Sequence, residues 1–451
     1  MILAQTRTLL HTITRFRSPE GQISTRPRRL VAFLAVHQFR AFLERLPIAF
    51  LGYVALLVAS LMPLSLRPWD TIAYVGDSLD AIYFMAWNAH QLFNDPLRLF
   101  DANLLYPHKN AALFDTHRLL PSILAAPLIA MTGNPVLAAN LVTGFALVFA
   151  AMSGRHLALA LRLGPGPAWV AGALYGFHTY QINEAPRVNV VFHGFWPLAI
   201  AELLAYLRSG ERKHAWRLGA VMLLQGLADN YNVVYAVLIL VLVTLAALAL
   251  DGRNTVARLP GLVPPALVAG LLFLPIVIPY SRAARTYDYA REAPVGIDLQ
   301  HYVSTSPGNL IYGPIGARVT QQQRGPHFVG FISLGLALLA LAAAGRKTRE
   351  DETNSLVPPR VWVPLCGGLG FVFVWLSLGR DTMAFGESLG PGPYRLLHAL
   401  PVFEYIRIPE RLSLVAMLFG ALLAARGIAL IGERSRFLAV GLAVLAPLEH
   451  L

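Results

Sequence analysis

The stretch VVYAVLILVLVTLAALAL, residues 233–250, contains no charged side chain, no glycine and no proline. A helix rises 1.5 Å per residue, so this stretch would extend about 27 Å, close to the roughly 30 Å hydrocarbon core of a bilayer. Its apolar residues are continuous, whereas a strand of a membrane barrel alternates apolar and polar residues. The stretch therefore predicts a membrane-spanning helix, because lipid accommodates only helices and closed barrels.

Similar apolar stretches recur along the whole chain. Of its 451 residues 56% are hydrophobic and 14% are charged, whereas ordinary soluble domains are about 25% charged. This composition excludes a soluble multidomain enzyme and predicts an all-α integral membrane protein. The apolar stretches are 48–66, 119–133, 137–161, 166–182, 194–207, 216–228, 233–250, 260–279, 328–344, 361–378, 412–431 and 436–451.

The stretch 119–133 decides the topology, because it is short and has a proline, Pro121, near its start. If it enters the bilayer and returns without crossing, the basic clusters around 208–217 and 346–360 lie on the same side as the arginine-rich N-terminus. Positive charge gathers in cytoplasmic loops, so we predict about 11 transmembrane helices plus one re-entrant helix, with a cytoplasmic N-terminus. The net charge of +12 is then explained by these loops and by anionic lipid, without a nucleic-acid partner.

This topology divides the chain into four parts. A basic leader, 1–47, contains an amphipathic helix lying on the membrane surface. A transmembrane module, 48–279, carries a long external loop, and a second external loop follows it. The C-terminal helices carry a third external loop. The three external loops are 67–136, 280–327 and 379–411, and the C-terminal part is 328–451.

The first external loop carries the acidic residues to which we give a chemical role. Asp77 and Asp80 are three residues apart and share one face if the segment is helical. Such a pair can accept a proton from a nucleophile or bind a divalent cation, Mg²⁺ or Mn²⁺. The alternative is a solvated loop in which Asp77 caps a helix N-terminus behind Gly76.

Several short motifs resemble one family. They are Gly76-Asp77-x-x-Asp80, Trp87-Asn88, Asn94-Asp95-Pro96, Tyr106-Pro107, Gly133-Asn134-Pro135, Phe177-His178-x-Tyr180 and Arg407-x-Pro409-x-Arg411. Together with one helix followed by a long acidic external loop, they resemble a bacterial branch of the GT-C superfamily of membrane glycosyltransferases. Protein mannosyltransferases and oligosaccharyltransferases share this architecture.

The resemblance implies a GT-C-type enzyme of the bacterial inner membrane. It implies a sugar donor linked to a polyprenyl phosphate, an envelope acceptor, and transfer on the external face with a loop carboxylate as base or metal ligand. It also leads us to expect a further external domain beyond Leu451. The sugar, the acceptor and the oligomeric state are not specified by these motifs.

Transfer from a lipid phosphate requires a base for the acceptor hydroxyl, cations for the leaving phosphate and an apolar groove for the prenyl chain. We predict Asp77 and Asp80 as catalytic residues, and as the metal ligands if a metal is used. External arginines near helix ends are suited to the phosphate, although lipid headgroups would bind them equally well. The predicted substrate-binding residues are Asp101, His117, Arg118, Glu184, Arg187, His193, Tyr231, Arg282, Arg407 and Arg411.

Three alternatives remain open from the sequence. Glu184 and Arg187 are close enough in the chain to form a simple ion pair. A transporter or flippase of lipid-linked saccharides would have a similar composition, but it would carry ionisable residues at mid-membrane depth. A noncatalytic subunit of envelope assembly would also have such a composition.

Overall fold

A computed structural model describes residues 48–287, 296–313, 325–345, 357–404 and 406–451. The predicted leader 1–47 lies outside the described residues. The chain separates into two compact units, Met1–Ala55 and Leu56–Leu451. The described residues of the first unit, 48–55, are helical.

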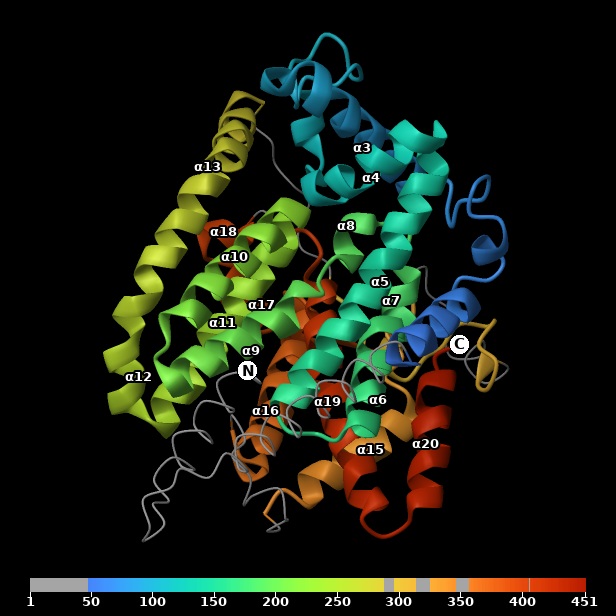
Figure 1. Cartoon of the computed structure of the whole chain (residues 1–451), viewed down its shortest axis with the longest axis vertical. Helices are drawn as coiled ribbons and strands as arrows, with labels where there is room; N and C mark the ends of the chain where they lie inside the picture. Colours follow the sequence, from blue (N-terminus) through green and yellow to red (C-terminus); the bar gives the residue numbers. More distant parts are fainter. Residues whose placement is uncertain (1–47, 288–295, 314–324, 346–356, 405) are drawn as a thin grey trace, which may run out of the picture. The chain divides into compact units, whose positions relative to one another are not determined.

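The described residues are mostly helical and contain little sheet (Figure 1). The longer helices are α3 (Asp77–Asn94), α4 (Leu119–Thr132), α5 (Pro135–Ala160), α6 (Pro165–Phe177), α9 (Phe195–Ser209), α10 (Arg212–Ala228), α11 (Asn230–Leu250), α13 (Val263–Thr286), α15 (Phe331–Ala342), α16 (Pro359–Ser377), α19 (Ser413–Gly432) and α20 (Arg436–Leu448). The short helices are α7 (Thr179–Asn183), α8 (Val188–Val191), α12 (Gly252–Arg258), α17 (Tyr394–His398) and α18 (Pro401–Glu404). Single 3₁₀ turns are η1 (Leu64–Leu66), η2 (Pro96–Arg98), η3 (Ala111–Phe114), η4 (Leu259–Leu262), η5 (Leu299–Tyr302) and η7 (Pro409–Leu412).

Within the described residues, 6 helical segments are long and apolar enough to cross a membrane. They are Pro135–Ala160, Val188–Ser209, Asn230–Leu250, Gly252–Thr286, Pro359–Ser377 and Pro409–Gly432. Shorter apolar helices are Ile48–Ser60, Leu119–Thr132, Phe331–Ala342 and Arg436–Leu448. The predicted span 166–182 is interrupted: α6 ends at Phe177 because His178 has an extended backbone and caps the short helix α7.

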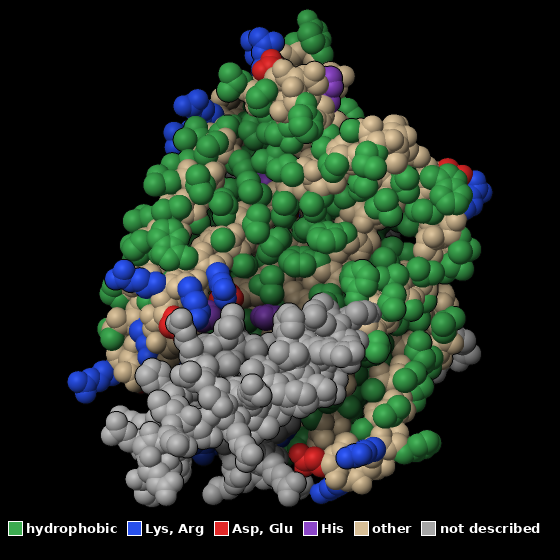
Figure 2. Space-filling view, viewed as in Figure 1, with side chains coloured by type: hydrophobic (Ala, Val, Ile, Leu, Met, Phe, Trp, Pro, Cys, Tyr) green, Lys and Arg blue, Asp and Glu red, His purple; other side chains and the backbone are tan. Residues whose placement is uncertain are grey.

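The outward faces of these helices are apolar. On α13, Leu267 and Leu271 are more than half exposed, and Leu245 on α11 is exposed as well. On the described part of the face shown in Figure 2, hydrophobic side chains far outnumber charged ones. An apolar surface of this extent would be unstable in water and matches the apolar interior of a bilayer. These faces and the long apolar helices indicate a membrane-embedded protein, as predicted.

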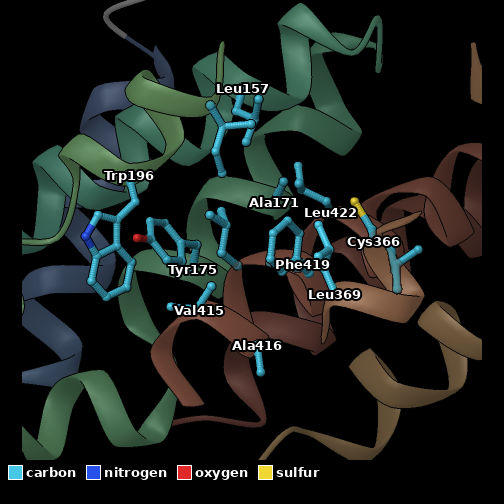
Figure 3. Packing of buried hydrophobic residues seen from close by; sticks show 14 of the residues in the cluster. Leu157, Ala171, Tyr175, Trp196, Cys366, Leu369, Val415, Ala416, Phe419 and Leu422 are labelled. Carbon is cyan, nitrogen blue, oxygen red and sulfur yellow. The ribbon is translucent and has the colours of Figure 1, made fainter. Parts of the chain in front are cut away.

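The core is built around α19, which packs against α6, α15, α16 and α20. Figure 3 shows Phe419 and Leu422 of α19 beside Cys366 and Leu369 of α16. Close packing depends on small residues: a Cβ atom at Gly427 would lie 2.3 Å from the carbonyl oxygen of Leu336 on α15. The α15 and α19 backbones can approach this closely only because this position carries no side chain.

The predicted first external loop is largely helical, since α3 and α4 form an antiparallel pair that packs against α5. Its two ends meet, because Asn134 donates a side-chain hydrogen bond of 2.9 Å to the carbonyl of Trp69. Asn140 on α5 donates likewise to the carbonyls of Pro68 and Thr71. The chain thus returns, after α4, to the place where the loop began.

A small hairpin, β1 (Asp381–Ala384) and β2 (Glu387–Pro391), lies in the predicted loop 379–411. The carboxylate of Asp298 accepts hydrogen bonds from the backbone N–H groups of Phe385 and Gly386 at the hairpin turn. It also accepts one from the N–H of Gln300, so these N–H groups hold its pKa below the usual range although burial acts in the opposite direction. The hairpin is thereby fixed to the segment that precedes η5.

Candidate active site

Four predicted site residues form one continuous chain of ion pairs. Arg187 lies 2.8 Å from the carboxylate of Asp77 and 2.5 Å from that of Glu184. The other carboxylate oxygen of Glu184 lies 3.5 Å from Arg411. We call this set the ion-pair chain. It joins the start of α3, the turn between α7 and α8, and η7, which are far apart in the sequence.

Burial differs along the ion-pair chain. The side chains of Glu184 and Arg411 are only 6% and 7% exposed, whereas those of Arg187 and Asp77 are 34% and 36% exposed. Buried charges are stable only when they are paired, so Glu184 needs its two arginines. The ion-pair chain therefore has a buried end at Glu184 and an accessible end at Asp77. At the accessible end, a ligand could replace Asp77 as the partner of Arg187.

Asp77 does not cap α3. The capping residue is Gly76, and no side chain caps this helix N-terminus by a hydrogen bond. The alternative interpretation of Asp77 as an N-cap is therefore wrong. Its position in the first turn still places a negative charge at the positive end of the helix, which stabilises the carboxylate.

Asp80 follows one turn later, and its side chain is exposed. Burial of part of the carboxyl group raises its pKa, and the nearby charges of Asp115 and Asp77 raise it further, while Arg118 opposes them. Asp77, Asp80 and Asp115 thus form an acidic group near two arginines. Their charges interact, but within the described residues no group of three or more His, Cys, Asp or Glu is arranged to hold a metal ion.

Arg118 is almost fully buried beside this acidic group. It lies 2.7 Å from Asp115, and its guanidinium lies 5.2 Å from the centre of the Phe84 ring. Asn88 holds the adjacent backbone by donating to the carbonyl of His117 at 2.7 Å and to the hydroxyl of Ser122 at 3.0 Å. Asn88 of the Trp87-Asn88 motif therefore has a structural role.

His117 is almost fully buried, and burial lowers its pKa to about 4. It is therefore neutral at pH 7. Its Nδ1 accepts a hydrogen bond from the N–H of Leu119 at 3.1 Å. A neutral imidazole in this position orders the start of α4 and brings no charge to the site.

Behind Arg411 lies a buried polar layer at the junction of α10 and α11. Asp229 accepts hydrogen bonds from the Asn189 side chain and from the N–H of Asn232, each at 2.9 Å. Arg411 lies over the Tyr231 ring, 5.8 Å from its centre. The structure thus brings the predicted Tyr231 to the ion-pair chain and adds Asp229, to which we gave no role from sequence.

His193 has a different environment from the one predicted. Its Nε2 lies 2.6 Å from the side-chain oxygen of Gln181 and its Nδ1 lies 2.5 Å from the Tyr175 hydroxyl. Its ring also stacks on Trp196. Since both ring nitrogens have protein partners, His193 is a hydrogen-bonded core residue in this structure.

Three predicted residues lie apart from the ion-pair chain. Asp101 accepts a hydrogen bond from the N–H of Asn110 within its own loop. Arg282 and Arg407 are exposed, and no ion pair within the described residues connects either of them to the ion-pair chain. Their predicted contact with phosphate stays a prediction.

Comparison with known proteins gives no family assignment: the chain matches no family model and no curated protein.

Proposed function

We propose that this protein is a membrane glycosyltransferase of GT-C-like architecture that transfers a sugar from a polyprenyl-phosphate donor to an envelope acceptor. The observation that carries the proposal is the ion-pair chain. Its accessible end combines a carboxylate suited to accept a proton with an arginine suited to bind phosphate. Its buried end, Glu184 with Arg411, holds that arrangement in place.

In the proposed chemistry, Arg187 exchanges one of its carboxylate partners for the donor phosphate. The guanidinium fork that now binds Asp77 and Glu184 matches a phosphate equally well. When the donor phosphate takes the place of Asp77, the Asp77 carboxylate becomes available as a base. Donor binding would thus activate the residue that the reaction needs.

In the transfer step Asp77 accepts the proton of the acceptor hydroxyl. The acceptor oxygen forms a bond to the anomeric carbon, and the bond between that carbon and the phosphate oxygen breaks. The phosphate leaves with the electron pair, and its negative charge is stabilised by Arg187, while Arg411 holds Glu184 in place behind it. Asp80 would assist by orienting Asp77 or replace it as the base.

Asp77 and Asp80 are also oxygen donors of the kind that Mg²⁺ and Mn²⁺ prefer. A cation held by two carboxylates would complete its shell with water and donor phosphate, as Mg²⁺ commonly does. We therefore keep these two residues as the proposed ligands of a divalent cation.

We further propose the predicted topology, with about 11 spans, α4 as a re-entrant helix and a cytoplasmic N-terminus in the bacterial inner membrane. The return of the chain from Asn134 to Trp69 supports it, because a segment whose ends meet makes no net crossing. The short length of α4, about 21 Å, agrees with this topology.

Reconstituted protein tests the function directly. Liposomes would contain a radiolabelled polyprenyl-phosphate sugar, and the products would be separated after adding an envelope extract as acceptor. We expect label to move from the lipid to the acceptor. Transfer of intact labelled lipid between leaflets, with the bond to phosphate unbroken, would instead identify a flippase.

A further inference from the structure

A groove separate from the ion-pair chain lies between α15 and α16. Both helices pack on α19 but touch each other little, which leaves a cavity of about 190 Å³ between them. Its lining includes three glycines, Gly367 and Gly370 of α16 and Gly420 of α19. We call this cavity the α15–α16 groove.

The mouth of the groove faces the apolar surface of the protein. Its lining includes Leu334 and Leu338 of α15, which are 40% and 57% exposed, and Phe371 of α16, which is 66% exposed. These side chains lie among helices whose outer faces match a bilayer interior. A ligand would therefore enter from the lipid phase and not from water.

The inner end of the groove is polar and includes His178, which is only 1% exposed. The Nδ1 atom of His178 accepts a hydrogen bond from the N–H of Gln181, so the proton of the neutral ring is on Nε2. That Nε2 has no hydrogen-bond partner among the described residues. The neighbouring polar groups have hydrogen-bond partners: the Ser333 hydroxyl donates to Glu449, and the Tyr302 hydroxyl pairs with Ser377.

We propose that the α15–α16 groove binds one hydrocarbon chain of a membrane lipid, with an acceptor oxygen of that lipid hydrogen-bonded to Nε2–H of His178. Apolar cavities of about 150 Å³ stay dry and bind hydrocarbon, and an unpaired buried donor gains from an acceptor. The lining on α19 runs from Ala416 to Leu423, about 10 Å along the helix, which suits a segment of one chain.

The groove is connected to the ion-pair chain through α7. His178 caps the N-terminus of this short helix, and Glu184 follows its last residue. A lipid bound to His178 would therefore steady the turn that holds Arg187. The binding proposal itself does not depend on the glycosyltransferase assignment, because it concerns occupancy and not turnover.

Photolabelling of the purified full chain tests the proposal. Two probes are used: a phospholipid with a diazirine in its acyl chain, and a polyprenyl phosphate with a diazirine in its isoprenoid chain. We expect adducts of at least one probe on peptides from α15, α16 or α19. The probe that reacts identifies the source of the chain, and adducts of both probes confined to other helices would overturn the proposal.

Gly420→Leu supplies the blocking variant. A Cβ atom at Gly420 has no atom within 4 Å, so the new side chain fits without a clash and fills the groove. The leucine and a lipid chain cannot both occupy the groove without overpacking it, so we expect labelling in the groove to fall about tenfold or more. Gly335→Leu on α15 is the matched control, since its Cβ also meets open space but Gly335 does not line the groove. Equal labelling of both variants would refute the site.

His178→Asn tests the polar end. The asparagine oxygen can still cap α7, because asparagine is among the best N-caps, but the Nε2–H donor is lost. We expect labelling to fall roughly 3- to 10-fold, the usual effect of one hydrogen bond. Unchanged labelling in His178→Asn would show that His178 donates no hydrogen bond to the lipid. These readouts require no transfer activity, so they succeed or fail separately from the proposed function.

Discussion

The Asp77 carboxylate and the Arg187 guanidinium lie 2.8 Å apart, which ties the first turn of α3 to the turn between α7 and α8. The sequence does not indicate this contact, because α3, α4, α5 and α6 lie between the two residues. The pair is half-exposed, so a surrounding solvent or ligand can compete for it. A carboxylate and a guanidinium held together at an accessible position can separate when a phosphate binds the guanidinium.

Asp77→Asn should abolish transfer and leave the protein folded. The change removes the basic oxygen, and loss of general-base catalysis costs roughly 10²–10⁴-fold in rate. Stability should change by less than about 1 kcal/mol, because a half-exposed ion pair contributes little. Transfer assays and thermal unfolding in detergent measure the two effects. Asp70→Asn, which removes the carboxylate of an exposed ion pair with Arg67 in the same loop, is the control. Near-normal turnover in Asp77→Asn would transfer the role to Asp80.

Arg411→Lys should reduce donor affinity with a smaller effect on folding. Lysine keeps the positive charge beside Glu184 but loses the planar guanidinium that fixes Glu184 and, through Glu184, the phosphate-binding Arg187. We expect about a tenfold weaker Kd for the polyprenyl-phosphate donor, as one strong hydrogen bond implies. Arg411→Ala should lower the free energy of unfolding by about 3–5 kcal/mol, because it leaves the buried carboxylate of Glu184 with one partner fewer.

Arg407→Lys is the matched comparison for Arg411→Lys. Arg407 is exposed and lies outside the ion-pair chain, so the same substitution there should change donor affinity less. Binding of the radiolabelled donor to the purified variants measures both. An equal loss of affinity in the two variants would favour the original sequence prediction, in which both arginines contact the phosphate.

The stability of the protein should increase with pH between about 4 and 6.5 in part because of His117. Burial lowers its pKa to about 4, whereas an unfolded histidine has a pKa of about 6.5. In this interval the unfolded chain binds the extra proton and the folded chain does not, so stability is complete above the interval and is lost as pH falls. The contribution is on the order of 3 kcal/mol.

His117→Asn tests this pH dependence. Its side-chain oxygen can replace Nδ1 as acceptor for the N–H of Leu119, but asparagine does not titrate. Unfolding followed by circular dichroism at several pH values should show a flatter profile than the wild type. His108→Gln, at an exposed position, should keep the wild-type profile. A variant profile as steep as that of the wild type would show that other groups determine the acid sensitivity.

Part of this molecule could be predicted from the sequence. Apolar stretches identify helices such as α5, α11 and α19 because burial in lipid depends on local composition alone. Asp77, Glu184, Arg187 and Arg411 were predicted individually as charged residues in predicted loops. The ion pair between Glu184 and Arg187, left open as an alternative from the sequence, is confirmed. Their contacts with Asp77 and Arg411 were not predicted, because side-chain contacts between distant loops depend on the packing of the helices that carry them.

Two features of the structure could not be predicted from local sequence. Tyr175 and Gln181 on neighbouring elements pair with both ring nitrogens of His193, and no local pattern encodes these partners; its role in substrate binding stays a prediction. The break in the predicted span 166–182 arises because His178 caps a new helix with its ring nitrogen, and histidine is an uncommon cap. The signal that could have found Asp229 is its place directly before an apolar run, a usual position for an N-cap.

The final prediction is that α4 enters the membrane and returns to the side from which it came. Its C-terminal end carries Met131, which is 82% exposed, and the loop that precedes α4 carries the exposed Lys109. In a Cys366→Ala background, which removes the only cysteine, we would introduce single cysteines at these two positions and at Asn254. Asn254 lies in the short basic helix α12, between α11 and α13.

Intact cells would then be treated with a membrane-impermeant maleimide before and after permeabilisation. We expect Met131→Cys and Lys109→Cys to react in intact cells and Asn254→Cys to react only after permeabilisation. Labelling of Lys109→Cys but not Met131→Cys would show that α4 crosses. Most basic loops after α4 would then lie outside, against the positive-inside rule. The hydrogen bond from Asn134 to Trp69 supports labelling of both variants in intact cells, because it holds the two ends of the segment 69–134 at the same depth.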